Sequence, residues 1–352
     1  MLSWADVSRA LTGTVPLYIA LMLGYGSVRW WRTFTAEHCD GINRMVCFFI
    51  IPLFSFQFTA AHADPFETNY SVIAADAISK ILAVFLIAVW AKFCRVTDRA
   101  GWCITGFSLC TLTNLLLVGV PVAKSMYGQL GIDLLIQLSV VQATLWFPIL
   151  LCFLELRKSF QDKESSRNGS LPSSDVEKDS FVDPTTRSQW SLFKIVGWKL
   201  AVNPNIYACV FGVIWAIISR RRKLKMPEIV DDSIQILSKA GIGTAMFNIG
   251  IFMAMQRKVI ACGTKVAIFA LVLRFVVGPA LTTLGALAVG LHGGVLQITI
   301  IQAALPQAIT TFIFAKEYGL HADVFSTAVV FGTLVSLPVL VAYCAALQVI
   351  QG

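Results

Sequence analysis

The chain is organised as a succession of apolar stretches, each about as long as a helix that crosses a lipid bilayer. A spanning helix needs about 20 mostly apolar residues. Five such stretches precede a polar segment at 158–190, and five follow it. They lie at 11–29, 41–60, 70–91, 101–125, 132–156, 200–219, 229–254, 259–289, 295–315 and 322–348. This pattern predicts an all-α integral membrane protein with ten transmembrane helices and a short, flexible linker at 158–190.

The two halves contain a matched motif, which indicates an internal repeat. GVPVAKSMYG at 119–128 and LPQAITTFIFAKEYG at 305–319 each contain a proline, then Ala-Lys, then Tyr-Gly. An odd number of spans in each half turns the second copy upside down, as in many secondary transporters. We therefore predict two inverted five-helix repeats, at 1–157 and 191–352. The fourth and ninth helices are expected to be broken by proline.

Composition supports the membrane assignment and excludes two other classes of protein. Hydrophobic residues make up 57% of the 352 residues, and charged residues only 14%. A soluble protein carries about 25% charged residues, and a disordered chain has low hydrophobicity. The net charge of +8 fits basic cytosolic loops better than nucleic-acid binding. Lys and Arg place the linker in the cytosol, although the basic run at 220–225 then falls on the opposite side.

The two matched prolines point to a site for an anion. Proline removes a backbone donor, so we expect the fourth helix to break at Pro121 and the ninth at Pro306. The second half of a broken helix begins with free N–H groups, and these favour negative charge. If both breaks meet near the membrane midplane, they form a carboxylate site without a fixed positive charge. The alternative is a pair of kinks without function.

Polar side chains beside the breaks are candidates for a substrate lining. Asn114 lies seven residues before Pro121, on the same helical face, and Gln307 adjoins Pro306. Further amides within or beside apolar runs serve either the substrate or hydrogen bonds between helices. These are Gln142, Asn203, Asn205, Asn248 and Gln302. Ser55 follows Ile51-Pro52 in another interrupted run, and Trp146 and Tyr207 are candidates for an aromatic wall.

Asp76 and Lys80 are the most informative charges within the apolar stretches. They are four residues apart, on one face of the third predicted helix. Ionisable residues inside a membrane are costly and usually functional. The pair either brackets the site or has a purely structural role. Arg274 lies deep in the eighth stretch, where the sequence shows no partner for it.

No pattern for enzymatic catalysis or for metal binding is present. The chain lacks HExxH, GxSxG and P-loop motifs, and its four histidines match no zinc pattern. The nine cysteines include no CxxC pair, and most lie in apolar runs, where they act as small hydrophobic residues. We therefore expect neither an enzyme nor a cofactor.

Several segments together resemble the plant PIN-FORMED auxin efflux carriers over nearly the whole chain. They are GINRMVCFFIIPLFSFQF (41–58), LTNLLLVGVP (112–121), NPNIY (203–207), GTAMFNIGIFMA (243–254) and QAALPQAITTFIFAKEYGLH (302–321). The resemblance implies a carrier for the anion of indole-3-acetic acid, without cofactors and with a homodimer as its assembly. Long-loop members act at the plasma membrane. The short linker resembles the short-loop subgroup, which resides in the endoplasmic reticulum.

The resemblance also assigns roles to individual residues. Asn114, Val120, Pro121 and Ile309 would lie at the crossing of the broken helices, beside Pro306 and Gln307. Ile51, Ser55, Gln142 and Asn205 would help to line the pocket, and Asp76 with Lys80 would form an adjacent support site. Thr113, Ala308 and Thr311 depart from the family pattern, which has Pro, Gly and Pro at these positions.

Three other interpretations remain open at the level of the sequence. One is a carrier for a different organic anion, and another is a receptor that binds auxin without moving it. The third concerns the coupling, since Asp76 could take up a proton during transport. Inverted symmetry favours a carrier over a static receptor.

Overall fold

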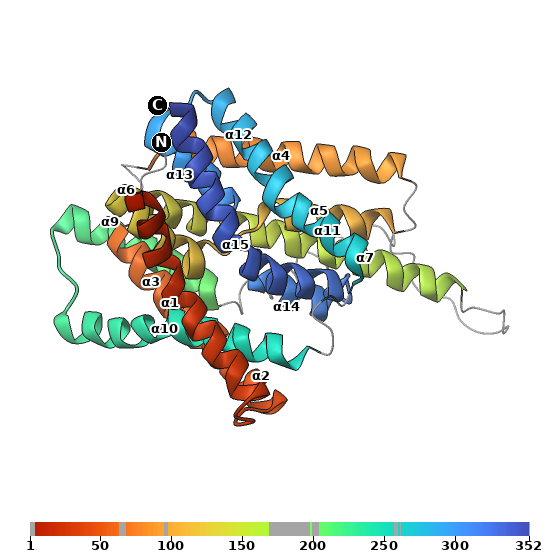
Figure 1. Cartoon of the computed structure of the whole chain (residues 1–352), viewed down its shortest axis with the longest axis horizontal. Helices are drawn as coiled ribbons and strands as arrows, with labels where there is room; N and C mark the ends of the chain where they lie inside the picture. The colour runs from red at the N-terminus through yellow and green to blue at the C-terminus, as the bar shows by residue number, and fades with distance from the viewer. Residues whose placement is uncertain are drawn as a thin grey trace, which may run out of the picture.

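The computed structural model describes residues 4–62, 68–94, 98–168, 198, 204–256, 260 and 262–351, and all elements in these residues are helical (Figure 1). The first half contains α1 (Trp4–Arg29), α2 (Ala36–Met45), η1 (Val46–Ile50), α3 (Ile51–His62), α4 (Tyr70–Phe93), α5 (Arg99–Thr111), η2 (Leu115–Gly119), α6 (Val120–Val141), η3 (Gln142–Trp146) and α7 (Phe147–Asn168). The second half contains α9 (Pro204–Arg222), α10 (Glu228–Met255), α11 (Thr264–Val272), η4 (Leu273–Val277), α12 (Gly278–Ala288), α13 (Gly293–Ala303), α14 (Ile309–Glu317) and α15 (Ala322–Gln351). The η segments are π-helical.

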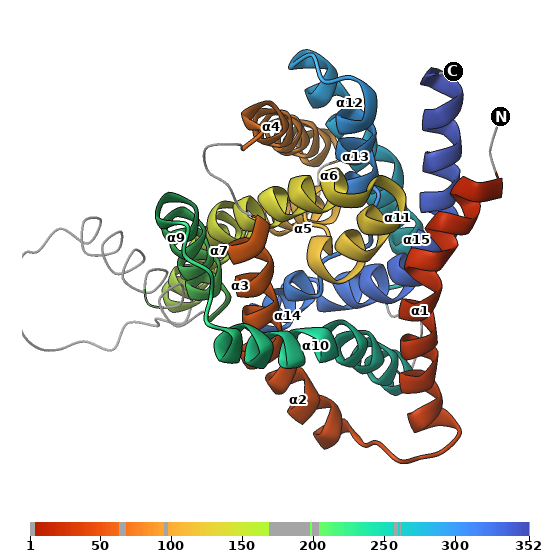
Figure 2. The ribbon, with the colours of Figure 1, turned by 90° about the vertical axis from the view of Figure 1, so that its left-hand side faces the viewer.

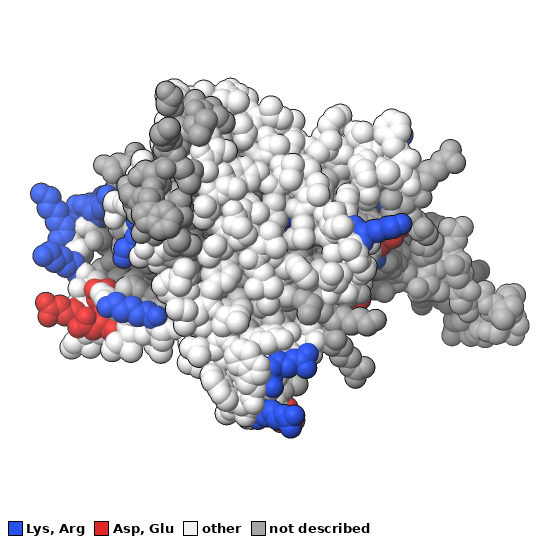
Figure 3. Space-filling model, in the orientation of Figure 1, with Lys and Arg blue, Asp and Glu red and all other residues white. Residues whose placement is uncertain are grey.

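The apolar stretches of the sequence fall on these helices. Within the described residues, six helical segments are long and apolar enough to cross a membrane, namely Glu37–Ala61, Tyr70–Phe93, Leu115–Lys158, Glu228–Met255, Thr264–Ala288 and Ala322–Leu347. Charged side chains on the visible face gather toward the ends and the lower edge of the molecule, and the broad surface between them is uncharged (Figure 3). Such a belt suits the hydrocarbon of a bilayer.

The helices pack as two groups. In one group α1 lies against α10, and α3 lies against α9 and α10 (Figure 2). In the other group α12 packs on α4 and α13, while η4 packs on α5. Glycines allow the backbones of α1 and α10 to approach closely. A Cβ at Gly250 would lie 1.9 Å from the Leu21 oxygen, and one at Gly24 would lie 2.0 Å from the Phe247 oxygen.

Each π-helical segment precedes a proline. The segments η1, η2, η3 and η4 end two residues before Pro52, Pro121, Pro148 and Pro279, respectively. Proline cannot donate to the carbonyl four residues earlier, and its ring clashes with that carbonyl. A π-helical turn relieves the clash and leaves a carbonyl available. The Phe275 oxygen, four residues before Pro279, accepts a 2.6 Å hydrogen bond from the Tyr343 hydroxyl instead.

The prediction that the fourth helix breaks at Pro121 is wrong. The interruption lies at 112–114, between α5 and η2, and Pro121 lies inside the continuous helix formed by η2 and α6, where the π-helical turn accommodates its ring. Helix α7 continues to Asn168, within the first part of the predicted linker. Residues 169–190 of the linker lie outside the described part of the chain. The ninth predicted helix is interrupted at 304–308, around Pro306 as expected.

Candidate functional site

The two interruptions meet through their backbones. The Asn114 N–H donates to the Pro306 oxygen over 2.9 Å, and the Ala308 N–H donates to the Leu112 oxygen over 3.2 Å. Thr113 and Gln307 therefore pair as one antiparallel β-bridge inside a helical protein. We call residues 112–114 and 306–308 the crossed break. It joins segments almost 200 residues apart, and it satisfies backbone groups that a broken helix leaves unpaired.

Two helix N-termini begin at the crossed break. Asn114 caps η2, because its side-chain oxygen accepts from the Leu117 N–H over 3.3 Å. Ala308 precedes α14 in an extended conformation, with φ of −65° and ψ of 130°. This φ suits any L residue, so the glycine of the family pattern is not required there. The helices that follow the crossed break, η2 and α14, thus bring the N–H groups of their first turns and their positive dipole ends to one place.

Gln142 supports the crossed break and is not among the residues that line the two cavities described below. Its side-chain oxygen accepts from the Thr113 N–H over 3.2 Å, and its amide donates to the Thr113 oxygen over 2.8 Å. Both backbone groups of Thr113 point away from the bridge, so a side chain must satisfy them. Gln142 itself is buried within η3. The pocket role that the resemblance implies for Gln142 stays a prediction, and the contacts seen in the structure are those with the Thr113 backbone.

Gln307 lies at the centre of a polar cluster. Its amide donates to the Ser108 oxygen over 3.1 Å and to the Thr311 hydroxyl over 2.8 Å. Thr311 in turn donates to the Ala308 oxygen over 2.6 Å, so this departure from the family's proline adds hydrogen bonds near the crossed break. Four buried polar atoms nearby have no hydrogen-bond partner within the described part of the chain, namely Ser108 Oγ, Thr113 Oγ1, Arg274 Nε and Gln307 Oε1. Such groups normally bind water or a ligand.

The hydrogen-bond partners of Arg274 lie at the C-terminal ends of α5 and α13, the helices that precede the crossed break. Its guanidinium donates to the Leu109 and Leu112 oxygens over 3.0 and 3.3 Å, and to the Ala303 oxygen over 2.7 Å. These carbonyls end α5 and α13, where the helix dipoles are negative. Arg274 is completely buried. The sequence offered no signal for these partners, since backbone carbonyls carry no residue identity.

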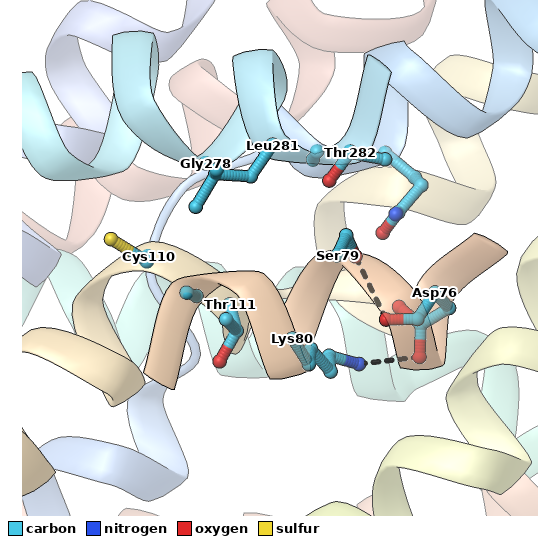
Figure 4. Close-up of a pocket in the computed structure, with 11 residues that line it drawn as sticks. Asp76, Ser79, Lys80, Cys110, Thr111, Gly278, Leu281 and Thr282 are labelled. Atoms are coloured by element: carbon cyan, nitrogen blue, oxygen red, sulfur yellow. Dashed lines mark hydrogen bonds and ion pairs between the residues drawn. The ribbon is translucent and has the colours of Figure 1, made fainter. Parts of the chain in front are cut away.

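Asp76 and Lys80 form the expected pair (Figure 4), and Trp146 contacts both of them. Asp76 Oδ2 accepts from Lys80 Nζ over 2.7 Å and from the Trp146 indole N–H over 2.9 Å. The Lys80 ammonium lies 4.7 Å from the centre of the Trp146 ring. Trp146 thus packs on the Asp76–Lys80 pair. The adjoining cavity, which includes Thr111, Thr282 and Gln302, measures about 10 Å³ and has room for roughly one water molecule.

A larger cavity lies beside the crossed break and reaches Ile309, the first residue of α14. It measures about 250 Å³ and lies between α2, η1, α10 and α14. Its lining is mostly apolar and includes the predicted residues Ile51 and Ile309, together with Phe252 and Phe312. Polar and charged groups also line it, namely Cys39, Asp40, Asn43, Asn248, Thr310 and Lys316. This mixture is typical of a small-molecule site. Among the described residues, no group of three or more His, Cys, Asp or Glu side chains could hold a metal ion.

The predicted site residues fall into three sets. Asn114, Pro306, Gln307 and Ile309 lie in or beside the crossed break. Ser55, Val120 and Pro121 are not among the residues that line the large cavity, and Val120 packs in the hydrophobic core instead. Asn203 and the Asn205 side chain lie outside the described part of the structure. Sequence reasoning missed Asn43 and Lys316, although Lys316 belongs to the Ala-Lys pair of the repeated motif.

Comparison with known proteins identifies a family of transporters. The model of the family described as "Membrane transport protein" matches residues 10–344. The chain is 53% identical over 353 residues to auxin efflux carrier component 5 of Arabidopsis thaliana, covering 100% of both chains. It is 50% identical over 364 residues to probable auxin efflux carrier component 5a of Oryza sativa subsp. japonica, again covering 100% of both. Auxin efflux carrier component 8 of Arabidopsis thaliana is 38% identical, over 97% of this chain and 98% of that protein.

Proposed function

The chain belongs to the auxin efflux carrier family of membrane transport proteins, which are not enzymes, and we propose that it carries the anion of indole-3-acetic acid across a membrane by alternating access. The observation that carries this proposal is the crossed break, where two helix N-termini meet beside a cavity of about 250 Å³. The N–H groups favour a carboxylate, and the apolar cavity wall suits an indole ring.

The cavity extends from the crossed break toward the end of the molecule that carries the linker. Its lining follows α14 from Ile309 to Lys316. Just beyond α14, the Tyr318 hydroxyl donates to Glu155 over 2.5 Å, in the part of α7 that leads to the linker. If the linker is cytosolic, the cavity lies on the cytosolic side of the crossed break. Movement of the two helix groups against each other would then expose the crossed break to the opposite side.

The remaining features of the proposal rest on the sequence and the family. We propose ten membrane spans in two inverted repeats, at 1–157 and 191–352, with a cytosolic linker between them. We further propose a homodimer in the membrane of the endoplasmic reticulum, because the linker is as short as in short-loop relatives. The relatives that match from end to end support this subgroup. Transport would then move auxin between the cytosol and the organelle lumen.

Currents from purified protein in liposomes on a supported membrane test this function. We expect a saturable current on addition of indole-3-acetic acid. One charge that crosses 100 mV gains about 2.3 kcal/mol, roughly a 50-fold ratio at equilibrium, so a potential alone is a sufficient driving force. Asn114→Ala removes the cap of η2 and should weaken the current. Lys80→Ala leaves Asp76 with Trp146 alone and should weaken it too.

A matched control removes an amide from the same part of the chain without touching the crossed break. Gln129 is exposed and bonds Asp133 within α6, so Gln129→Ala should keep the wild-type current. Saturable binding without current would favour a receptor or an electroneutral exchanger. Binding of other organic acids in preference to auxin, in a competition panel, would contradict the substrate.

A further inference from the structure

Arg274 brings an uncompensated positive charge to the crossed break. Its three hydrogen-bond acceptors in the part of the chain that the structure describes are all backbone carbonyls, and none is a carboxylate. Among the described residues, the other buried charges near it are Asp76 and Lys80, which pair with each other over 2.7 Å. One carboxylate and two cations leave this region with a net charge of +1. The guanidinium of arginine keeps its proton even when buried, so the charge is fixed.

The charge lies against the backbone of the anion site itself. The Leu112 oxygen accepts from both Arg274 and the Ala308 N–H, so one carbonyl connects the guanidinium to the residue that directly precedes α14. The Ala303 oxygen connects it to the last residue of α13. Arg274 therefore neutralises the negative C-terminal ends of α5 and α13, which precede the crossed break. The positive N-terminal ends of η2 and α14, which follow it, remain uncompensated.

A fixed buried charge without a counter-ion is unfavourable, and an anion nearby relieves it. Resting on the function proposed above, we propose that Arg274 sets the preference of the site for organic monoanions over neutral analogues. Arg274 is a positioning residue, since it acts through carbonyls and its own field rather than by contact with the substrate. The carbonyl bonds orient the crossed break, and the charge raises the affinity for a carboxylate. An occupied site is electrically neutral, and an empty one carries the charge.

Binding of an acid and of its uncharged amide separates the charge from a structural role. Indole-3-acetic acid and indole-3-acetamide have nearly the same shape, and only the acid is an anion at pH 7. We compare the ratio of their dissociation constants in wild type, Arg274→Lys and Arg274→Gln. We expect Arg274→Gln to lower the preference for the acid on the order of tenfold or more, and Arg274→Lys to retain most of it. Equal losses for both ligands in Arg274→Gln would overturn the inference.

A second measurement uses wild-type protein, in case Arg274→Gln does not fold. Arg274 lies in the same helix group as the crossed break, since η4 packs on α5, so its charge moves with the substrate. Exchange of labelled for unlabelled auxin should be almost independent of the membrane potential, because the occupied site is neutral. Net transport should depend on the potential. Exchange as sensitive to potential as net transport would overturn the inference. Failure of wild type to bind any aromatic acid would overturn the proposed function as well.

Discussion

Replacement of Gln142 by Met tests whether a single side chain holds the crossed break together. Gln142 bonds both the N–H and the carbonyl of Thr113, which is 1% exposed. Met has nearly the same volume and can form neither bond. Each buried backbone group left without a partner costs about 1–3 kcal/mol. Hydrogen bonds between membrane helices average only about 0.6 kcal/mol, so the upper part of the range for two such groups is not reached. We therefore expect a loss of about 2–4 kcal/mol in the free energy of unfolding.

Gln137 is a matched control for this substitution. It lies on α6, and its side-chain oxygen accepts one hydrogen bond of 3.1 Å from the Asn69 N–H, which is only partly buried. Gln137→Met should cost about 0.5–1 kcal/mol. Equilibrium unfolding with increasing amounts of SDS in mixed micelles measures both variants. Transport currents should fall in Gln142→Met and persist in Gln137→Met. Equal stability of the two variants would refute the role given to Gln142.

Three further predictions follow from other contacts. Lys80→Met should lower the free energy of unfolding by about 3–5 kcal/mol, because it removes the partner of the buried Asp76 carboxylate. The double variant with Asp76→Asn should recover much of this loss in the same SDS assay. A double variant no more stable than Lys80→Met would contradict this role of the pair. Gly250→Ala should cost about 1–3 kcal/mol, since its Cβ would lie 1.9 Å from the Leu21 oxygen, whereas Gly243→Ala meets no atom within 4 Å and should not destabilise α10. Burial lowers the pKa of His321; Arg157 acts in the same direction and Asp98 in the opposite one. The unfolded chain therefore takes up a proton on this histidine at a higher pH than the folded protein does. The melting temperature should consequently fall as the pH drops below about 6.5. His321→Asn, which tolerates the local φ of 45°, should flatten that dependence, and an unchanged slope would exclude His321 as its source.

The sequence by itself determined the features that depend on local chemistry. Length and hydropathy located the apolar helices, because a bilayer imposes both requirements on each segment separately. The spacing of Asp76 and Lys80 predicted their contact, since residues four apart share a helical face. The proline of the ninth stretch marked its interruption, because Pro306 has no N–H to continue the helix.

Only the tertiary structure decided where the fourth helix breaks and what surrounds the site. Pro121 continues a helix because a π-helical turn absorbs its ring, and the break falls at Thr113, where Gln307 and Gln142 supply partners from distant segments. The carbonyls that hold Arg274 belong to residues far apart in the chain. Their contacts depend on how the helices pack, and a backbone oxygen looks the same at every position of the sequence. Helix positions are therefore local properties of this chain, whereas the crossed break forms only when the two halves of the chain fold together.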